Sequence, residues 1–498
     1  MTRRWRSHTR SPSVLIIGTG FGGIGMAIRL LKAGIHDITL LEKTGGVGGT
    51  WRDNTYPGAA CDVQSHLYSY SFEPKHDWSR KFGTQKEILE YIESCVRKYQ
   101  LTPRIRFNQA VQSAEFDDQS NQWRVTTETG DIYAANVLVT ATGQLNRPAI
   151  PDLPGLDSFQ GQQFHSARWD HSLDLRGKRV AVIGTGASAI QFVPEICGKV
   201  ASLDLYQRSA AWVLPKADRP FSPLEQTLFK KLPLWDRAYR ATIYMKNEAR
   251  ALAFTRFSGV LDIFARQARK LARRDVTNEA KFEAIVPDYQ IGCKRILISN
   301  EWYKAINKPQ LNLITDGIER VNETGLISGS GDHRPADVII FGTGFRASEF
   351  LSPIRITGRH GRSLNEAWAN GSRAFKGITV SGFPNLFMLY GPNTNLAHNS
   401  ILYMLESQYR YIISALKALS RYPNAAMDVR EDRLVSYSES VQENLDGSVW
   451  QAGCTSWYLD RHGRNTINWP GFTFSYRFST RAVDTADYQF IAPAGEPS

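Results

Sequence analysis

The chain has 498 residues, of which 42% are hydrophobic and 22% charged, and its formal net charge is +12 at pH 7. This composition is typical of a globular protein, and the length allows about two or three domains. No stretch approaches the roughly 18 consecutive apolar residues of a membrane span, so we expect no stable membrane insertion. The basic residues are dispersed and accompany no nucleic-acid motif, so we expect no nucleic-acid partner.

The N-terminal arginines and the cysteines bear on export and redox state. Arg3-Arg4 precedes only a short apolar run, which predicts a basic tail and not a twin-arginine export signal. Five cysteines are scattered without a Cys-x-x-Cys pair. This pattern predicts neither a disulfide framework nor a metal site, and it favours a reducing compartment such as the cytoplasm.

The first glycine-rich turn follows a short apolar run, Val14–Ile17, that predicts a buried parallel strand. Gly18, Gly20 and Gly23 fit G-x-G-x-x-G, in which the helix that follows presents backbone amides to a pyrophosphate. The next predicted strand ends in Glu42, 24 residues after Gly18. A carboxylate there accepts hydrogen bonds from ribose and repels a 2′-phosphate, so this site predicts FAD or NAD.

A second turn repeats the pattern with the opposite charge. Gly184, Gly186 and Ala189 occupy the three turn positions, and the following strand ends in Arg208, 24 residues after Gly184. A guanidinium with Ser209 beside it suits a 2′-phosphate, so this site predicts NADPH. Two dinucleotide sites in one chain indicate electron transfer from NADPH to FAD, and the missing redox-active cysteine pair disfavours the disulfide reductases of that class.

The stretch FQGQQFHSARWD between the two turns, residues 159–170 and here termed the fingerprint segment, carries a family resemblance. Phe159, Gly161, His165, Trp169 and Asp170 match in full the fingerprint F-x-G-x-x-x-H-x-x-x-W-[P/D] of the type I Baeyer–Villiger monooxygenases. The segments GGTWRDNTYPGAACD, ATGQLNRPAIPDLPG, YQIGCKR, DVIIFGTGF and LYGPNTNLAHNSI also resemble that family, with Gly342 where many members have alanine. The resemblance covers nearly the whole chain.

This resemblance implies a reaction and roles for particular residues. NADPH reduces FAD, oxygen adds to the flavin to give a C4a-peroxyflavin, and this attacks a ketone to yield an ester or lactone. Arg295 matches the catalytic arginine and Asp62 the acid that orients it, while Lys294 matches a lysine associated with the 2′-phosphate. The remaining flavin and nucleotide contacts that we expect are Thr50, Trp51, Asp62 and Ser188, with Tyr68 as a weaker candidate and Trp212 near the nicotinamide.

In this family the fingerprint segment is a linker between the FAD and NADP domains. Its histidine is then not the chemical base, and we expect His165 to couple the nicotinamide position to domain rotation. A satisfied core histidine is the alternative.

The predicted architecture is α/β, with two Rossmann-like domains and a helical insertion in the NADP domain. Apolar residues at helical spacing predict helices over about 217–287, where a basic face of Arg266, Arg269, Lys270, Arg273 and Arg274 indicates a solvated surface or a membrane-surface contact. We expect C-terminal aromatic residues to form core and partly to line a ketone pocket. The expected segments are FAD domain 11–150 and 376–498, NADP domain 151–216 and 289–375, and insertion 217–288.

Two other functions remain open from the sequence. A monooxygenase of nitrogen or sulfur would use the same cofactors, but it needs the protonated, electrophilic flavin peroxide, so a fixed cation matters less there. A non-catalytic flavin-binding sensor would show no turnover. We expect a monomer or weak homo-oligomer with a small ketone and O₂ as its partners.

Overall fold

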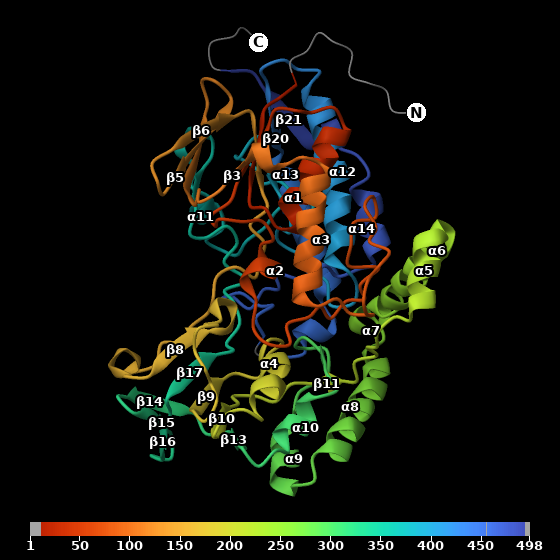
Figure 1. Cartoon of the computed structure of the whole chain (residues 1–498). Helices are drawn as coiled ribbons and strands as arrows, with labels where there is room; N and C mark the ends of the chain where they lie inside the picture. The colour runs from red at the N-terminus through yellow and green to blue at the C-terminus, as the bar shows by residue number, and fades with distance from the viewer. Residues whose placement is uncertain (1–10, 455, 494–498) are drawn as a thin grey trace.

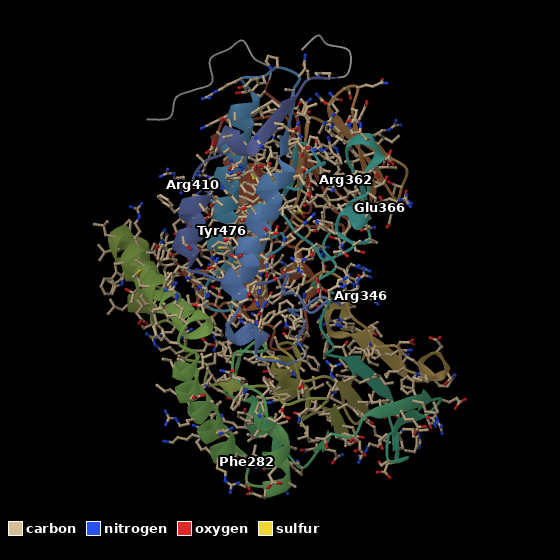
Figure 2. The ribbon with its side chains drawn as sticks, turned by 180° about the vertical axis from the view of Figure 1, so that it is seen from behind. Phe282, Arg346, Arg362, Glu366, Arg410 and Tyr476 are labelled. Carbon is tan, nitrogen blue, oxygen red and sulfur yellow. A yellow bond between two sulfur atoms is a disulfide. The ribbon has the colours of Figure 1, made fainter. Side chains whose placement is uncertain are left out.

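The computed structural model describes residues 11–454 and 456–493, so the N-terminal Arg3-Arg4 pair lies outside the described residues. Figure 1 shows two lobes joined at a waist, with a row of helices along one side of both lobes. Two of the segments that join the lobes lie side by side at the waist: Ala149 N donates to Gly344 O at 2.9 Å, and Arg346 N donates to Arg147 O at 3.0 Å. Arg346 lies at this waist in the opposite view (Figure 2).

A parallel sheet with the strand order β19-β7-β1-β2-β3 forms the centre of the first lobe. All residues of β1 and β7 are buried, as expected for a sheet covered on both faces. Helix α1 contacts both α3 and α12. The elements are β1 (Val14–Ile17), β2 (Ile38–Leu41), β3 (Ile105–Arg106), β7 (Val137–Thr140), β19 (Leu386–Met388), α1 (Phe21–Lys32), α2 (Thr50–Asp53), α3 (Gln85–Lys98) and α12 (Ile401–Leu419).

A smaller sheet completes the first lobe, in the order β18-β4-β5-β6. Its strands are β4 (Val111–Asp117), β5 (Gln122–Thr127), β6 (Ile132–Ala135) and β18 (Arg355–Thr357), and α11 (Leu364–Ala367) contacts β18. Because β18 pairs in parallel with β4, the chain has already returned to the first lobe before residue 355. The expected NADP segment 289–375 therefore extends too far, since no local pattern marks the partner of so short a strand.

The second lobe repeats the architecture with a parallel sheet in the order β13-β10-β9-β17-β8. Its elements are β8 (Gln162–His165), β9 (Arg179–Ile183), β10 (Ser202–Tyr206), β13 (Leu311–Ile314), β17 (Val338–Phe341), α4 (Ala189–Ile196) and α10 (Trp302–Ile306). An antiparallel sheet of β14 (Ile318–Asn322), β15 (Gly325–Ser328) and β16 (His333–Pro335) lies beside it, and β11 (Val213–Leu214) pairs with β12 (Leu297–Ile298).

The helices predicted over about 217–287 are present and connect the two lobes. They are α5 (Pro223–Lys231), α6 (Pro233–Glu248), α7 (Ala251–Thr255), α8 (Leu261–Asp275) and α9 (Glu279–Ile285), along one edge of the molecule in Figure 1. Phe229 and Tyr239 pack into the core of the first lobe, whereas Leu271 and Ala272 pack into that of the second. The insertion is thus in contact with both domains, not with the NADP domain alone.

The C-terminal segment returns to the first lobe. It contains α13 (Glu431–Leu445), α14 (Thr473–Ser479) and an antiparallel pair of β20 (Ala426–Val429) with β21 (Tyr488–Ile491). Tyr476 of α14 is fully buried and is seen beside α12 in Figure 2. Val449 and Trp450 pack against Phe254 and Leu261 of the insertion, so this segment also covers the helical row.

One covalent link was not expected from the sequence. Cys293 and Cys454 form a disulfide across 161 residues, although the scattered cysteines predicted no disulfide framework. Both cysteines belong to one apolar cluster formed by the insertion, the segment before β12 and the C-terminal segment. Because only the fold brings them together, their spacing carries no sequence signal. Cys61, Cys95 and Cys197 are free and buried.

Among the described residues, no helix has the length and apolarity needed to cross a bilayer. Within the same ranges, no group of three or more His, Cys, Asp or Glu side chains is arranged to hold a metal ion.

The third glycine of the first turn gives a test of the fold. A Cβ on Gly23 would lie 1.9 Å from the carbonyl oxygen of Gly18, a backbone atom that cannot move without separating α1 from β1. We expect Gly23→Ala to lower the free energy of unfolding by about 3 kcal/mol and to release flavin. Gly259→Ala is the control, because a Cβ there meets nothing within 4 Å. Equal stability of the two variants in denaturant titrations would contradict this packing.

Candidate functional site

A cavity of about 1500 Å³ lies between the lobes and is lined by both glycine-rich turns. Typical sites for one small ligand have volumes of roughly 300–1,000 Å³, so this cavity has room for more than one such ligand. Its walls also include the residues expected to contact flavin and nucleotide: Thr50, Trp51, Asp62, Ser188, Arg208, Ser209, Lys294 and Arg295.

The two turns are built in the same way. Gly18 has φ +103°, and a Cβ there would lie 2.6 Å from the carbonyl oxygen of Ala141, just after β7. Gly184 has φ +107°, and a Cβ would lie 2.6 Å from the carbonyl oxygen of Gly342, just after β17. Each turn is therefore in backbone contact with the linker that leads from its own lobe to the other.

Gly342 departs from the family pattern, and the structure shows how this is accommodated. A Cβ at Gly342 would lie 3.3 Å from the Cβ of Ala189, the third residue of the second turn. A glycine at one position thus makes room for the alanine at the other.

Glu42 ends β2 inside the cavity wall and is 6% exposed. One carboxylate oxygen accepts from the amide and hydroxyl of Thr19 at 3.1 and 2.6 Å, and the other accepts from the amide and hydroxyl of Thr44, both at 2.9 Å. A carboxylate has about four acceptor positions, so a ribose hydroxyl must displace one of the two threonine hydroxyls. We still predict that Glu42 binds ribose, and this binding requires that one threonine hydroxyl leave the carboxylate.

The short helix α2 places Thr50 and Trp51 on the wall near the first turn. The Trp51 indole Nε1 donates to the hydroxyl of Tyr68 at 3.1 Å, and Gln85 Nε2 donates to the Trp51 carbonyl at 2.5 Å. Tyr68 also lines the cavity. Trp212 does not line it: its Nε1 donates to the Tyr289 carbonyl at 3.0 Å, and the ring is buried in the core.

A cationic corner lies beside the second turn. Lys294 Nζ donates to Ser209 Oγ at 3.0 Å and lies 4.5 Å from the ring centroid of Tyr289. Burial and the neighbouring Arg208 guanidinium lower the pKa of Lys294, although Asp288 opposes this effect. Arg208 is exposed and makes no ion pair within the described part of the chain. Two close cations without a carboxylate partner form a receptive site for a phosphate dianion.

This corner predicts coenzyme discrimination. We expect Arg208→Ala to raise the KM for NADPH by about 10- to 100-fold while changing that for NADH little, since only NADPH carries the 2′-phosphate. Steady-state kinetics with both coenzymes measures the effect. Arg124→Ala is the control, because Arg124 is an exposed arginine on β5 that does not line the cavity. Equal losses for both coenzymes would contradict the assignment.

Asp62 and Arg295 are 233 residues apart in sequence and meet in the cavity wall, where Arg295 Nη2 donates to Asp62 Oδ2 at 2.5 Å. About one third of each side chain is exposed, 33% and 36%, and both residues line the cavity. Burial would raise the pKa of Asp62, but attraction to Arg295 and their hydrogen bond outweigh it and lower that pKa. Asp62 in turn raises the pKa of Arg295, so the guanidinium keeps its charge.

The wall beyond this pair comes from residues that the sequence analysis did not name individually. Tyr390 and Asn395 line the cavity, and the Tyr390 hydroxyl donates to Asn395 Oδ1 at 2.6 Å. Buried Tyr458 lies near Arg295 and contributes to raising its pKa. The available signal was the run of polar residues between β19 and α12. These are Asn393, Thr394, Asn395, His398, Asn399 and Ser400, and all are buried.

Of the C-terminal aromatic residues, Trp457 lines the cavity. Trp450 and Tyr458 are buried in the core, whereas Phe474 is 54% exposed. Core packing is therefore confirmed for Trp450 and Tyr458 and cavity lining for Trp457, whereas Phe474 does neither.

Glu248 at the end of α6 supports the same wall from behind. It is 4% exposed and accepts from Asn399 Nδ2 at 2.6 Å and from Thr473 Oγ1 at 2.8 Å. Since Asn399 lines the cavity, the helical insertion directly supports the side of the cavity formed by the C-terminal segment.

Cys61 is a cysteine in the cavity wall, and burial raises the pKa of its thiol. Among the described residues, no other cysteine lines the cavity. The site therefore lacks the paired thiols that a disulfide reductase uses.

The fingerprint segment lies next to the cavity, and its five matching residues are not in the cavity lining. A Cβ on Gly161 would lie 2.4 Å from the Phe159 ring and 2.5 Å from the Asp337 carbonyl oxygen. Trp169 packs against Phe192 of α4 with ring centroids 5.2 Å apart. Asp170 accepts from the Ser172 amide and hydroxyl at 2.9 and 2.6 Å, which closes the turn that follows.

His165 is the member of this segment that reaches the waist. It ends β8 opposite Phe341 of β17 and is 3% exposed. Its Nδ1 accepts from the Ala167 amide at 3.1 Å, and its ring lies 5.6 Å from that of Phe345, the residue after the second linker glycine. Burial lowers the pKa of His165 to about 4, which the Gly344 backbone partly opposes. The coupling role remains a prediction, and this contact with the crossing strand is consistent with it.

Adjacent side chains also join the lobes. Gln191 of α4 accepts from the Ala60 amide and donates to the Ala60 carbonyl, both at 3.1 Å. Arg168 lies 3.6 Å from Asp53, and His171 contacts Thr55 at 2.8 Å. The loop that carries Asp62 is thus held against the helix of the second turn.

The lowered pKa of His165 predicts a pH dependence of stability. Between its ordinary value of 6.5 and about 4, the unfolded chain binds a proton that the folded chain does not. Folding stability is therefore lost as pH falls through this window, by roughly 2–3 kcal/mol from this group. We expect His165→Asn, whose side chain can still accept from Ala167, to reduce the loss between pH 7 and 4.5 in denaturant titrations. An unchanged pH slope would show that His165 contributes nothing to it.

The chain is similar to known proteins over most of its length. Residues 15–250 match the family model for pyridine nucleotide-disulphide oxidoreductase. A Baeyer–Villiger monooxygenase of Pseudomonas aeruginosa is 47% identical over 96% of this chain and 91% of its own, and one of Streptomyces coelicolor is 44% identical over 97% and 93%. The structure of an oxidized steroid monooxygenase bound to NADP is 30% identical with a TM-score of 0.86, over 97% of this chain and 100% of that one.

The fold and the cavity define a flavoprotein class with two dinucleotide-binding domains. Within that class, identity to these relatives over nearly the whole length of both chains identifies the group. The chain belongs to the Baeyer–Villiger monooxygenase family.

Proposed function

We propose that this protein is an NADPH- and O₂-dependent flavin monooxygenase that converts ketones to esters or lactones. The observation that carries the proposal is the Asp62–Arg295 pair in the wall of a cavity that both glycine-rich turns share. The family membership and the ketone monooxygenases among its structural relatives support the same reaction.

The residues of the cavity fit the two cofactors. Gly18, Gly20, Glu42, Thr50 and Trp51 would hold FAD, with Gly23 packing the helix behind the turn. The second turn, through Gly184, Gly186 and Ser188, and the cationic corner of Arg208, Ser209 and Lys294 would hold NADPH. Bound NADPH supplies hydride, and bound flavin supplies the activation of oxygen.

The role of Arg295 follows from its charge and its partner. Insertion of oxygen next to a carbonyl passes through negatively charged oxygen, which a fixed cation in a partly desolvated wall stabilises. Arginine suits this task because it does not lose its proton, and Asp62 orients it while raising its pKa. About one third of the Arg295 side chain stays exposed in the cavity wall, where substrate can reach it.

The proposal includes location and assembly. We propose a cytoplasmic enzyme, as the sparse cysteines favour, that acts as a monomer or weak homo-oligomer on a small ketone. The Cys293–Cys454 bond is unusual for a reducing compartment. Counting free thiols in protein purified without reductant tests this part separately.

Arg295 provides the test of the reaction. We expect Arg295→Ala to lower the rate of ester formation from a ketone panel by about 10²–10³, and Arg295→Lys to retain part of it. Asp62→Asn should show a smaller loss, because it disturbs the orientation of Arg295 and leaves its charge. Product analysis by mass spectrometry under labelled oxygen measures each rate.

The matched control is Arg176→Ala, which removes an exposed arginine from its pair with Asp174. It should leave the rate unchanged. Full ester formation by Arg295→Ala would overturn the mechanism. Oxidation of a thioether but of no ketone by the wild type would identify a sulfur-oxygenating enzyme, and NADPH consumption that no substrate stimulates would indicate a sensor.

A further inference from the structure

Helix α6 exposes apolar residues and buries polar ones, which is the reverse of an ordinary surface helix. Its solvent face carries Leu234, Ala238, Ala241 and Met245, spaced to form one stripe, and Leu234 and Met245 are 78% and 64% exposed. Trp235, at the edge of this stripe, is 52% exposed. The buried residues of the same helix are Asp236, Ile243, Asn247 and Glu248, of which three are polar. Surface helices normally bury the apolar face.

Polar contacts fix this orientation. Asp236 lies 3.5 Å from His66 and 3.3 Å from His76, and Asn247 Nδ2 donates to Gln64 Oε1 at 3.3 Å. Glu248 holds Asn399 and Thr473, as described above. Rolling the helix to bury its stripe would break all these contacts and leave buried polar groups unpaired. The apolar stripe is therefore exposed as a consequence of the folded state.

The charge around the stripe indicates what covers it. Residues 223–248, which span α5 and α6, contain five Lys and Arg against three Asp and Glu. Of these carboxylates, Asp236 and Glu248 are buried, and Glu225 is paired with Arg219. Lys230, Lys231, Arg237 and Lys246 are exposed beside the stripe and make no ion pair with a carboxylate of the described residues.

We propose that the α5–α6 surface docks on an anionic lipid surface, with the stripe and Trp235 in the headgroup boundary and the flanking cations against lipid phosphates. Exposed Leu224 and Leu232 extend the apolar surface, and a tryptophan is favoured at this boundary. A second copy of the chain fits less well, since it would bring the unpaired cations Lys230, Lys231, Arg237 and Lys246 of both copies together. The helices lie in the plane of the surface and do not span it.

Sedimentation of the flavin-loaded enzyme with vesicles tests this docking. We expect it to bind vesicles of equimolar phosphatidylcholine and phosphatidylglycerol at low salt, and to bind pure phosphatidylcholine or high-salt samples weakly. The combined variant Leu234→Ser, Trp235→Ser, Met245→Ser should bind the anionic vesicles at least about tenfold more weakly than the wild type. Its NADPH-dependent turnover should be unchanged. The double variant Lys230→Gln, Lys231→Gln should weaken binding to the anionic vesicles and leave the weak binding to pure phosphatidylcholine unchanged.

The matched control is Ile132→Ser, which removes an apolar side chain that is 53% exposed on β6, away from the insertion. It should bind like the wild type. If the combined variant fails to fold, Trp235→Phe replaces it. Brominated lipid should then quench the tryptophan fluorescence of the wild type more than that of Trp235→Phe. No sedimentation of the wild type, equal quenching, or lipid-independent dimers that the combined variant abolishes would each overturn the proposal.

Discussion

The pairing of Arg295 with Asp62 is the interaction on which the site depends, because the two charges come from different lobes. Asp62 belongs to a loop of the first lobe that Gln191 of the second lobe holds, and Arg295 precedes β12 in the second. A lone guanidinium in this wall would be desolvated without compensation. The pair thus keeps a permanent cation in the cavity and ties its position to the fit of the two lobes.

The linkers extend this dependence to the turns. In each lobe the first glycine of the turn touches the carbonyl of the first linker residue, and the two crossing strands pair with each other at the waist. His165 adds a buried ring against Phe345 on the returning strand. From these contacts we predict that a rotation of one lobe shifts the turns where phosphates are expected to bind.

Local patterns predicted much of this from sequence. Glycine spacing after a β-branched run defined both turns, and helical spacing defined the insertion, because each depends on neighbours within one element. The pairing of β18 with β4, the Cys293–Cys454 bond and the support of Asn399 by Glu248 were missed, as each joins residues more than 100 positions apart. The resemblance supplied Asp62 and Arg295 as partners, which spacing alone could not.

The helical row has a mechanical consequence for the two lobes. Helix α6 is anchored to the first lobe through buried polar contacts, and α8 is anchored to the second through Leu271 and Ala272. Any change in the angle between the lobes must therefore be absorbed between these anchors, in the stretch that holds the five-residue helix α7 and Gly259. We expect that stretch to bend when the angle between the lobes changes.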